Sequence, residues 1–98
     1  SDLVIFANAA EIKLFIALHI YMYGKILDYG QKFEIVFEGN ELIFSSEKVL
    51  QSEGELTQNL FLPGYYFTYT LENILRNNRL EQKIVDDDLR IVFPLEQE

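Results

Sequence analysis

The sequence contains no cysteine and no tryptophan, and it has one histidine and two prolines among its 98 residues. Without cysteine the chain forms neither a disulfide framework nor a thiolate metal site, and a single histidine excludes a histidine-rich metal site. The cytoplasm is therefore the default compartment. The apolar run Leu14–Gly24 has only about half the length of a membrane-spanning helix, and Leu3–Ala10 lacks the basic start of a signal peptide.

Basic residues are also few, since 8 lysines and arginines stand against 16 acidic residues and the net charge is −8. Such a surface repels phosphate backbones and anionic lipids, which excludes nucleic acids and membrane surfaces as favoured partners. The apolar fraction of 49% is sufficient for one hydrophobic core. We therefore expect a single folded domain that spans residues 1–98.

The longest periodic stretch, from Asn8 to Gly30, predicts an amphipathic helix around which the rest of the chain is organised. Asn8 is the expected N-cap, Glu11 lies in the first turn, and Gly30 is expected to be the left-handed residue at the C-terminal end. The predicted apolar face contains Ile12, Phe15, Ile16, Ile20, Tyr23, Ile26 and Leu27, and it is widened by Leu18, Met22 and Tyr29. So wide an apolar arc suits a helix that lies on a sheet.

Alternating residues then predict a first β-hairpin, with a type II′ turn at Gly39-Asn40. This register places Phe37 opposite Leu42 and Ile35 opposite Phe44, so that all four side chains share one face. The preceding run Leu3–Phe6 is expected to be an edge strand or a lead-in.

The signal is weaker from Ser45 to Pro63, where we expect a short helix at about Ser46–Gln51 and an irregular stretch at Leu56–Leu62. Pro63-Gly64 then opens a second helix, roughly Tyr65–Asn78, which Asn77-Asn78 can end. Its predicted core face consists of Phe67, Leu71, Ile74 and Leu75.

A second hairpin closes the chain, with a two-residue turn at Asp86-Asp87. That turn places Ile84 opposite Leu89 and Leu80 opposite Phe93. The inward positions of its last strand are Leu89, Ile91, Phe93 and Leu95. Pro94 indicates an edge or a strand end.

The order helix, hairpin, short helix, helix, hairpin predicts an α+β fold, a two-layer α/β sandwich with helices on one face of an antiparallel or mixed sheet. Over Ile12–Phe93 it resembles a reduced form of the histidine-kinase ATPase fold. Within that superfamily it is most similar to the C-terminal domain of the alphaproteobacterial histidine phosphotransferases of the ChpT type. The matching stretches are IKLFIALHIYMYGKIL, FEIVFEGNELIFSS, PGYYFTYTLENILRNNRLEQKI and LRIVF.

The resemblance implies a phosphorelay component. In that family a helical hairpin that bears the phosphoaccepting histidine precedes a degenerate kinase-like domain. This chain would then support the hairpin and help the receiver domain of a response regulator to dock, with a sensor kinase as a further partner and a homodimer as the assembly. The accepting histidine would lie outside the chain, so we expect no catalytic residue here.

ATP-binding members of the superfamily carry a helix asparagine for Mg²⁺, an Asp-x-Gly-x-Gly segment and a later glycine-rich turn. In this chain Ala17 stands at the place of the asparagine. Asp28-Tyr29-Gly30 precedes the first hairpin instead of following it, and Gly54 and Gly64 are isolated. We interpret these glycines as turn and cap residues, and we expect no ATP, metal or other cofactor.

Three other features allow two interpretations each. His19 is either a phosphoacceptor or a packing residue, and its neighbours Leu18 and Ile20 favour packing. The segment Asp86–Asp88 is either a cation site or a solvated acidic turn, and adjacent side chains diverge in a turn. The tyrosines form either a contact patch or pocket, or a cover over the core with the hydroxyls in water: Tyr21, Tyr23, Tyr65, Tyr66 and Tyr69.

Two other functions remain open. The chain could be a stand-alone α/β interaction module that forms a homodimer through its apolar first helix. It could also be a small-molecule or nucleotide-binding enzyme, which ranks last because the sequence shows no nucleophile–base pair, metal cluster or phosphate loop.

Overall fold

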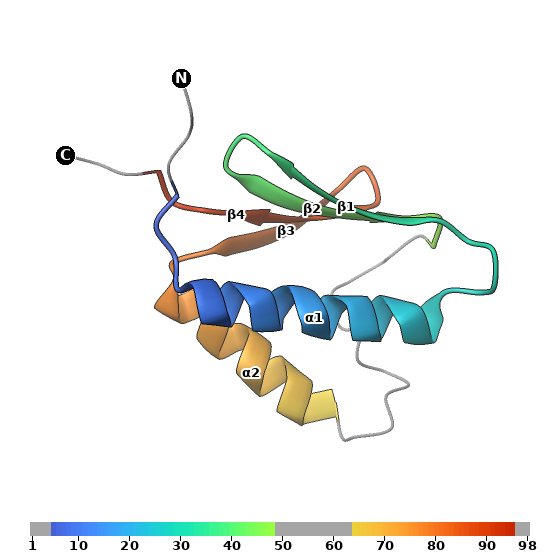
Figure 1. Cartoon of the computed structure of the whole chain (residues 1–98), viewed down its shortest axis with the longest axis horizontal. Helices are drawn as coiled ribbons and strands as arrows, with labels where there is room; N and C mark the ends of the chain where they lie inside the picture. The colour runs from blue at the N-terminus through green and yellow to red at the C-terminus, as the bar shows by residue number, and fades with distance from the viewer. Residues whose placement is uncertain (1–4, 49–63, 96–98) are drawn as a thin grey trace.

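A computed structural model describes residues 5–48 and 64–95 of the chain, with two helices on one face of a four-stranded antiparallel sheet (Figure 1). The elements are α1 (Ala9–Ile26), β1 (Phe33–Glu38), β2 (Glu41–Ser46), α2 (Gly64–Asn77), β3 (Glu81–Val85) and β4 (Asp88–Val92). The strand order is β1-β2-β4-β3, so one strand of each hairpin is central. The predicted α+β fold is confirmed over these residues, and its arrangement is that of a two-layer sandwich.

Helix α1 begins as predicted, because the Asn8 side chain accepts a hydrogen bond from the Glu11 N–H at 3.0 Å. Its end differs from the prediction. Leu27 leaves the helix in an extended conformation, and Gly30, with φ of +90°, instead lies in a turn closed by the Gln31 N–H on the Asp28 carbonyl. Gly30 therefore has the expected positive φ, but its predicted role as the helix C-terminal residue is wrong.

The buried face of α1 contains Phe15, His19, Met22 and Tyr23. The predicted face is wrong at Ile20, which is 50% exposed, and at Tyr29, which is fully exposed beyond the helix end. Ile20 lies at the flank of the helix, about 100° from the direction of His19, and so points past the sheet.

Both hairpins have the predicted registers. Phe37 pairs with Leu42, and Gly39 alone of the two turn residues has a positive φ, as a type II′ turn requires. Ile84 pairs with Leu89 across a turn in which both aspartates, Asp86 and Asp87, have positive φ, which is type I′ geometry.

The ladder between β3 and β4 ends at Glu81 and Val92, one position short of the predicted pair, but Leu80 and Phe93 are both buried. Leu95 was predicted to point inward and is instead 55% exposed. The reason is that β4 ends at Val92, so the alternation of the strand does not extend past Pro94. Pro94 thus marks a strand end, as expected.

Helix α2 ends in a Schellman motif, in which the Leu80 N–H donates to the Leu75 carbonyl and the Arg79 N–H to the Arg76 carbonyl. The left-handed residue of this motif is Arg79, with φ of 55°, and not one of the two asparagines. On the predicted core face Phe67 and Ile74 are buried, while Leu71 and Leu75 are half-buried.

Several predictions fall on residues outside the described ranges. Ser46, the expected cap of the short helix, is the last residue of β2, and the helix beyond residue 48 and the stretch Leu56–Leu62 are not described. Ile5 and Phe6 form a lead-in without strand pairing, whereas Leu3 and Val4 are outside the ranges.

The core lies between the helices and the sheet. It is formed by Phe15, Met22 and Tyr23 of α1, Phe67 and Ile74 of α2, Leu42 and Phe44 of β2, Leu89 and Ile91 of β4, and Leu80 and Phe93 beside the strands. Asn40 joins the first turn to the end of β4. Its side-chain amide donates to the Phe93 carbonyl at 2.7 Å, and its backbone carbonyl accepts from the Phe93 N–H at 2.8 Å. No helix in the described ranges is long and apolar enough to cross a membrane.

Candidate functional site

His19 is in the core and does not face solvent. Its side chain is 1% exposed, and its ring stacks on Phe44 with centroids 4.6 Å apart and lies 4.3 Å from Phe15. The Nδ1 atom donates to the Phe15 carbonyl at 2.8 Å, and because a carbonyl only accepts, this nitrogen carries a proton. The interpretation of His19 as a packing residue is confirmed.

The burial of His19 also fixes its charge. Desolvation lowers the pKa of the imidazole from 6.5 to about 4, although the hydrogen bond to Phe15 acts in the opposite direction. The ring is therefore neutral at physiological pH. A phosphoaccepting histidine needs an exposed imidazole with a base beside it, whereas the ring of His19 is buried against Phe44.

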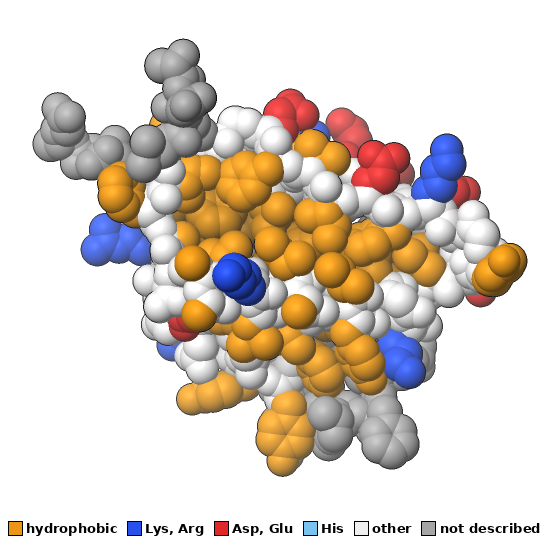
Figure 2. Space-filling view, in the orientation of Figure 1, with side chains coloured by type: hydrophobic (Ala, Val, Ile, Leu, Met, Phe, Trp, Pro, Cys, Tyr) orange, Lys and Arg blue, Asp and Glu red, His pale blue; other side chains and the backbone are white. Residues whose placement is uncertain are grey.

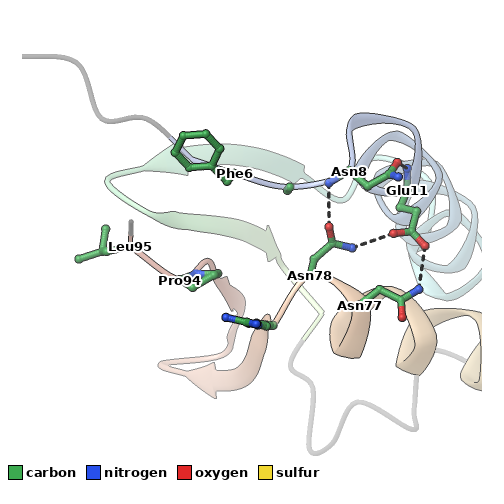
Figure 3. Close-up of a pocket in the computed structure, with 9 residues that line it drawn as sticks. Phe6, Asn8, Glu11, Asn77, Asn78, Pro94 and Leu95 are labelled. Carbon is green, nitrogen blue, oxygen red and sulfur yellow. Dashed lines mark hydrogen bonds between the residues drawn. The ribbon is translucent and has the colours of Figure 1, made fainter. Parts of the chain in front are cut away.

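A polar cluster joins the first turn of α1 to the end of α2 (Figure 3). Asn78, which is 8% exposed, donates to Glu11 at 3.0 Å and to the Ile74 carbonyl at 2.9 Å, and its Oδ1 accepts from the Asn8 N–H at 2.8 Å. Asn77 donates to the second oxygen of Glu11 at 3.1 Å. The cluster fixes the angle at which the two helices meet.

An open cavity of about 1000 Å³ lies beside this cluster. Its other walls are the exposed apolar side chains of Phe6, Pro94 and Leu95, together with Arg79. The Arg79 guanidinium forms no hydrogen bond or ion pair with another described residue. Among the described residues, the cavity lining thus combines an apolar rim, the Arg79 cation and a polar wall that includes the Glu11 carboxylate.

Sequence reasoning missed this site. The sequence predicts Asn78 only as a helix terminator, and nothing in it marks Arg79 as a left-handed residue. The available signal was the pair Asn77-Asn78 at a helix end together with an acidic residue in the first turn of the other helix.

A second surface of interest is the side of α1 that faces away from the core. Leu14 is 46% exposed, Ile20 50% and Tyr21 38%, and between them Ala17 is exposed as well. In Figure 2 hydrophobic side chains cover the middle of the molecule over α1, while most acidic side chains in view lie along the upper rim. Ala17 therefore presents a methyl group on an apolar surface.

Gly24 lies on the same side of α1, and no contact with the described residues explains why this position is a glycine. A methyl group added there would meet no atom of theirs within 4 Å, and the residue is in the interior of the helix. Glycine at such a position destabilises a helix by roughly 0.5–1 kcal/mol relative to alanine.

The tyrosines divide between the two interpretations. Tyr23 is fully buried, its hydroxyl has no partner among the described residues, and desolvation and then the Asp88 carboxylate raise the pKa of the phenol. Tyr21 stacks on Phe67 with centroids 5.7 Å apart and remains partly exposed. Tyr66 and Tyr69 are exposed on α2, and the side chain of Tyr65 is not described.

The remaining candidate residues lie in turns. Asp86 and Asp87 are exposed in the turn of the second hairpin, and Asp88 begins β4. Asp28-Tyr29-Gly30 forms the turn after α1, Gly64 begins α2, and Gly54 lies outside the described ranges. Among the residues that the structure covers, no group of three metal-ligating side chains comes together.

Comparison with known proteins finds no matching family, no similar curated protein and no similar solved structure.

Proposed function

We propose that this chain is the kinase-like domain of a histidine phosphotransferase in a cytoplasmic phosphorelay, and that it acts without ATP. Two things support the proposal: the stretches that resemble this family, and the observed order of helices and hairpins around one core. The observation that carries it is Ala17. At the position of the Mg²⁺ ligand the chain has an exposed methyl group among apolar neighbours, which suits protein contact and not nucleotide binding.

In this proposal the rim of the cavity supports the histidine hairpin. Segments that precede α1 in the chain reach this end of the molecule first, through the lead-in at Ile5–Asn8. Phe6 is 61% exposed and Leu95 55%, so both can pack against an amphipathic helix. Arg79 is a cation beside that rim, and it is suited to the acidic pocket of a receiver domain.

Titration of the ¹⁵N-labelled chain tests the proposal. Receiver domains from the source genome are added one at a time, and ATP with Mg²⁺ is added separately. We expect one receiver to shift the amide signals around Arg79 and the cavity rim, and ATP to shift none. Signals near Ala17 that move with ATP, or a full set of receivers without effect, would contradict the proposal.

A stand-alone interaction module is the second candidate function, and the exposed apolar side of α1 favours it. The same titration separates the two functions. A module outside the phosphorelay binds none of the receivers, whereas a phosphotransferase domain binds at least one.

A further inference from the structure

The exposed side of α1 alternates small and large residues along its whole length. Five positions lie within about 80° of the helix surface when each residue turns by 100°. In chain order they are Ala10, Lys13, Ala17, Ile20 and Gly24. All five are exposed, whereas Leu27, the next position in this spacing, has left the helix and packs against the core. They follow the alternating three- and four-residue spacing that packs one helix against another.

This pattern is complementary to itself in the antiparallel direction. When a second α1 runs the opposite way, with a two-fold axis between Ala17 and Ile20, each large side chain faces a small one. Ile20 then packs on Ala17 of the second copy, and the Lys13 stem packs on its Gly24. A two-fold interface requires this kind of self-complementarity.

We propose that a second copy of this chain docks along this side of α1, as an antiparallel helix pair. The proposal goes beyond the phosphorelay function and does not depend on it. The proposal explains why residue 24 is a glycine. No atom of the described residues requires a glycine there, but the absence of a side chain makes room for the Lys13 stem of the other copy.

Charge also favours a second copy at this place. Each chain carries a net charge of −8, so two copies repel each other over most approaches. From Ile12 to Ile26, however, α1 contains no acidic residue, and its only charged residues are Lys13 and Lys25. Two acidic molecules that approach along this side of the helix therefore bring no acidic side chain of Ile12–Ile26 close to its counterpart.

The size of the contact sets the expected strength. Helix α1 has 18 residues and is about 27 Å long. A contact along one such helix is at or below the low end of specific interfaces, which bury about 1,200 Å² or more in total. We therefore expect a dimer that dissociates at micromolar concentrations.

Cysteine cross-linking tests the register directly, because the chain has no cysteine of its own. In the proposed pair position 13 faces position 24, whereas 13 and 13, or 24 and 24, are about 16 Å apart along the axis. A disulfide needs Cβ atoms about 4 Å apart. Mixed Lys13→Cys and Gly24→Cys proteins, one of them ¹⁵N-labelled, should therefore give the heterodimer under mild oxidation, with little of either homodimer.

Two results would overturn the proposal. A heterodimer only about twice as abundant as each homodimer, which is the ratio that random pairing gives in an equal mixture, would mean that the pairing is not antiparallel in this register. A heterodimer yield no higher than that from Glu34→Cys, an exposed control on the sheet, would mean that the pair does not form.

Sedimentation equilibrium of the unmodified chain provides an independent readout. We expect a monomer–dimer equilibrium that Ala17→Glu abolishes and that Tyr29→Glu, which adds the same charge beyond the helix end, leaves unchanged. Both positions are exposed, so thermal melts should show that both variants fold. A wild-type chain that remains monomeric at every concentration, or an Ala17→Glu variant that dimerises normally, would contradict the docking.

Discussion

The imidazole of His19 lies against the ring of Phe44, with the two planes inclined by 19° and the centroids 4.6 Å apart. This contact joins the middle of α1 to β2, a central strand of the sheet. The only histidine of the chain is thus part of the structure that holds the helix on the sheet.

Because of His19, the free energy of unfolding should decrease when the pH is lowered. Its pKa is about 4 in the folded chain and 6.5 in the unfolded chain, so between these values only the unfolded chain binds the proton. Stability is therefore lost as the pH falls from 6.5 to about 4, by about 3 kcal/mol at 1.36 kcal/mol per pKa unit. His19→Leu lacks this loss. Urea unfolding of both proteins at about pH 7 and about pH 4.5 measures it, and identical pH dependence would contradict the burial.

Substitutions at neutral pH test the same contact. His19→Leu should be neutral or stabilising, because it replaces a polar ring in an apolar site. His19→Asp should lower the free energy of unfolding by about 2 kcal/mol or more, since it buries an unpaired charge. Thermal melts decide: two variants that both melt like the wild type would show that the ring is on the surface.

Asn78 should contribute far more to stability than its neighbour Asn77. Asn78→Ala removes three hydrogen bonds and leaves the Asn8 N–H without its partner, which should cost about 1–3 kcal/mol. Asn77→Ala removes one exposed hydrogen bond to Glu11 and should cost about 0.5 kcal/mol or less. Chemical denaturation of the two variants makes the comparison, and equal losses would mean that the cluster does not join the helices.

Arg79 should make the chain less stable than a glycine at the same position would. Its φ of 55° favours glycine, so Arg79→Gly should raise the free energy of unfolding by up to about 1 kcal/mol. Arg79→Ala keeps a Cβ at this positive φ, and therefore keeps the backbone strain, so it should give no such gain. If the guanidinium contacts a receiver domain, both variants bind that domain more weakly, although only one of them is more stable. A gain in stability from the alanine variant would show that the strain is absent.

The sequence predicted elements whose information is local. The Gly39-Asn40 turn and the alternation of Ile35 and Phe37 specify the first hairpin, because turn chemistry and the buried face agree on one register. The N-cap of α1 was equally predictable from Asn8 and Glu11.

Features that depend on distant residues were not predictable. The end of α1 depends on Leu27 taking an extended conformation, which no local signal indicates. The exposure of Ile20 depends on how α1 is rotated on the sheet, and that rotation is set by contacts such as His19 on Phe44. The link between Asn78 and Glu11 spans 67 positions in the chain. Neither the cavity nor the polar cluster could therefore be assembled from the sequence.

ATP with Mg²⁺ should not stabilise the chain. A ligand at a hundredfold excess over its Kd adds about 2.7 kcal/mol to the free energy of unfolding. In a domain of this size that corresponds to a rise in Tm of about 10 °C or more. Thermal melts with and without millimolar nucleotide should coincide, with calcium-free buffer and Mg²⁺ alone as controls. A reproducible rise of several degrees would mean that the chain binds nucleotide, in spite of Ala17 and its isolated glycines.

Phosphotransfer tests the central claim most directly. A radiolabelled, phosphorylated receiver domain is incubated with this chain, and in parallel with the whole gene product that contains any residues encoded before Ser1. Transfer requires an exposed imidazole that reaches the phospho-aspartate with a base beside it, and His19 is buried. We therefore expect no label on this chain and label on the longer protein. Label on this chain that disappears in His19→Ala, or label on neither protein, would contradict the account.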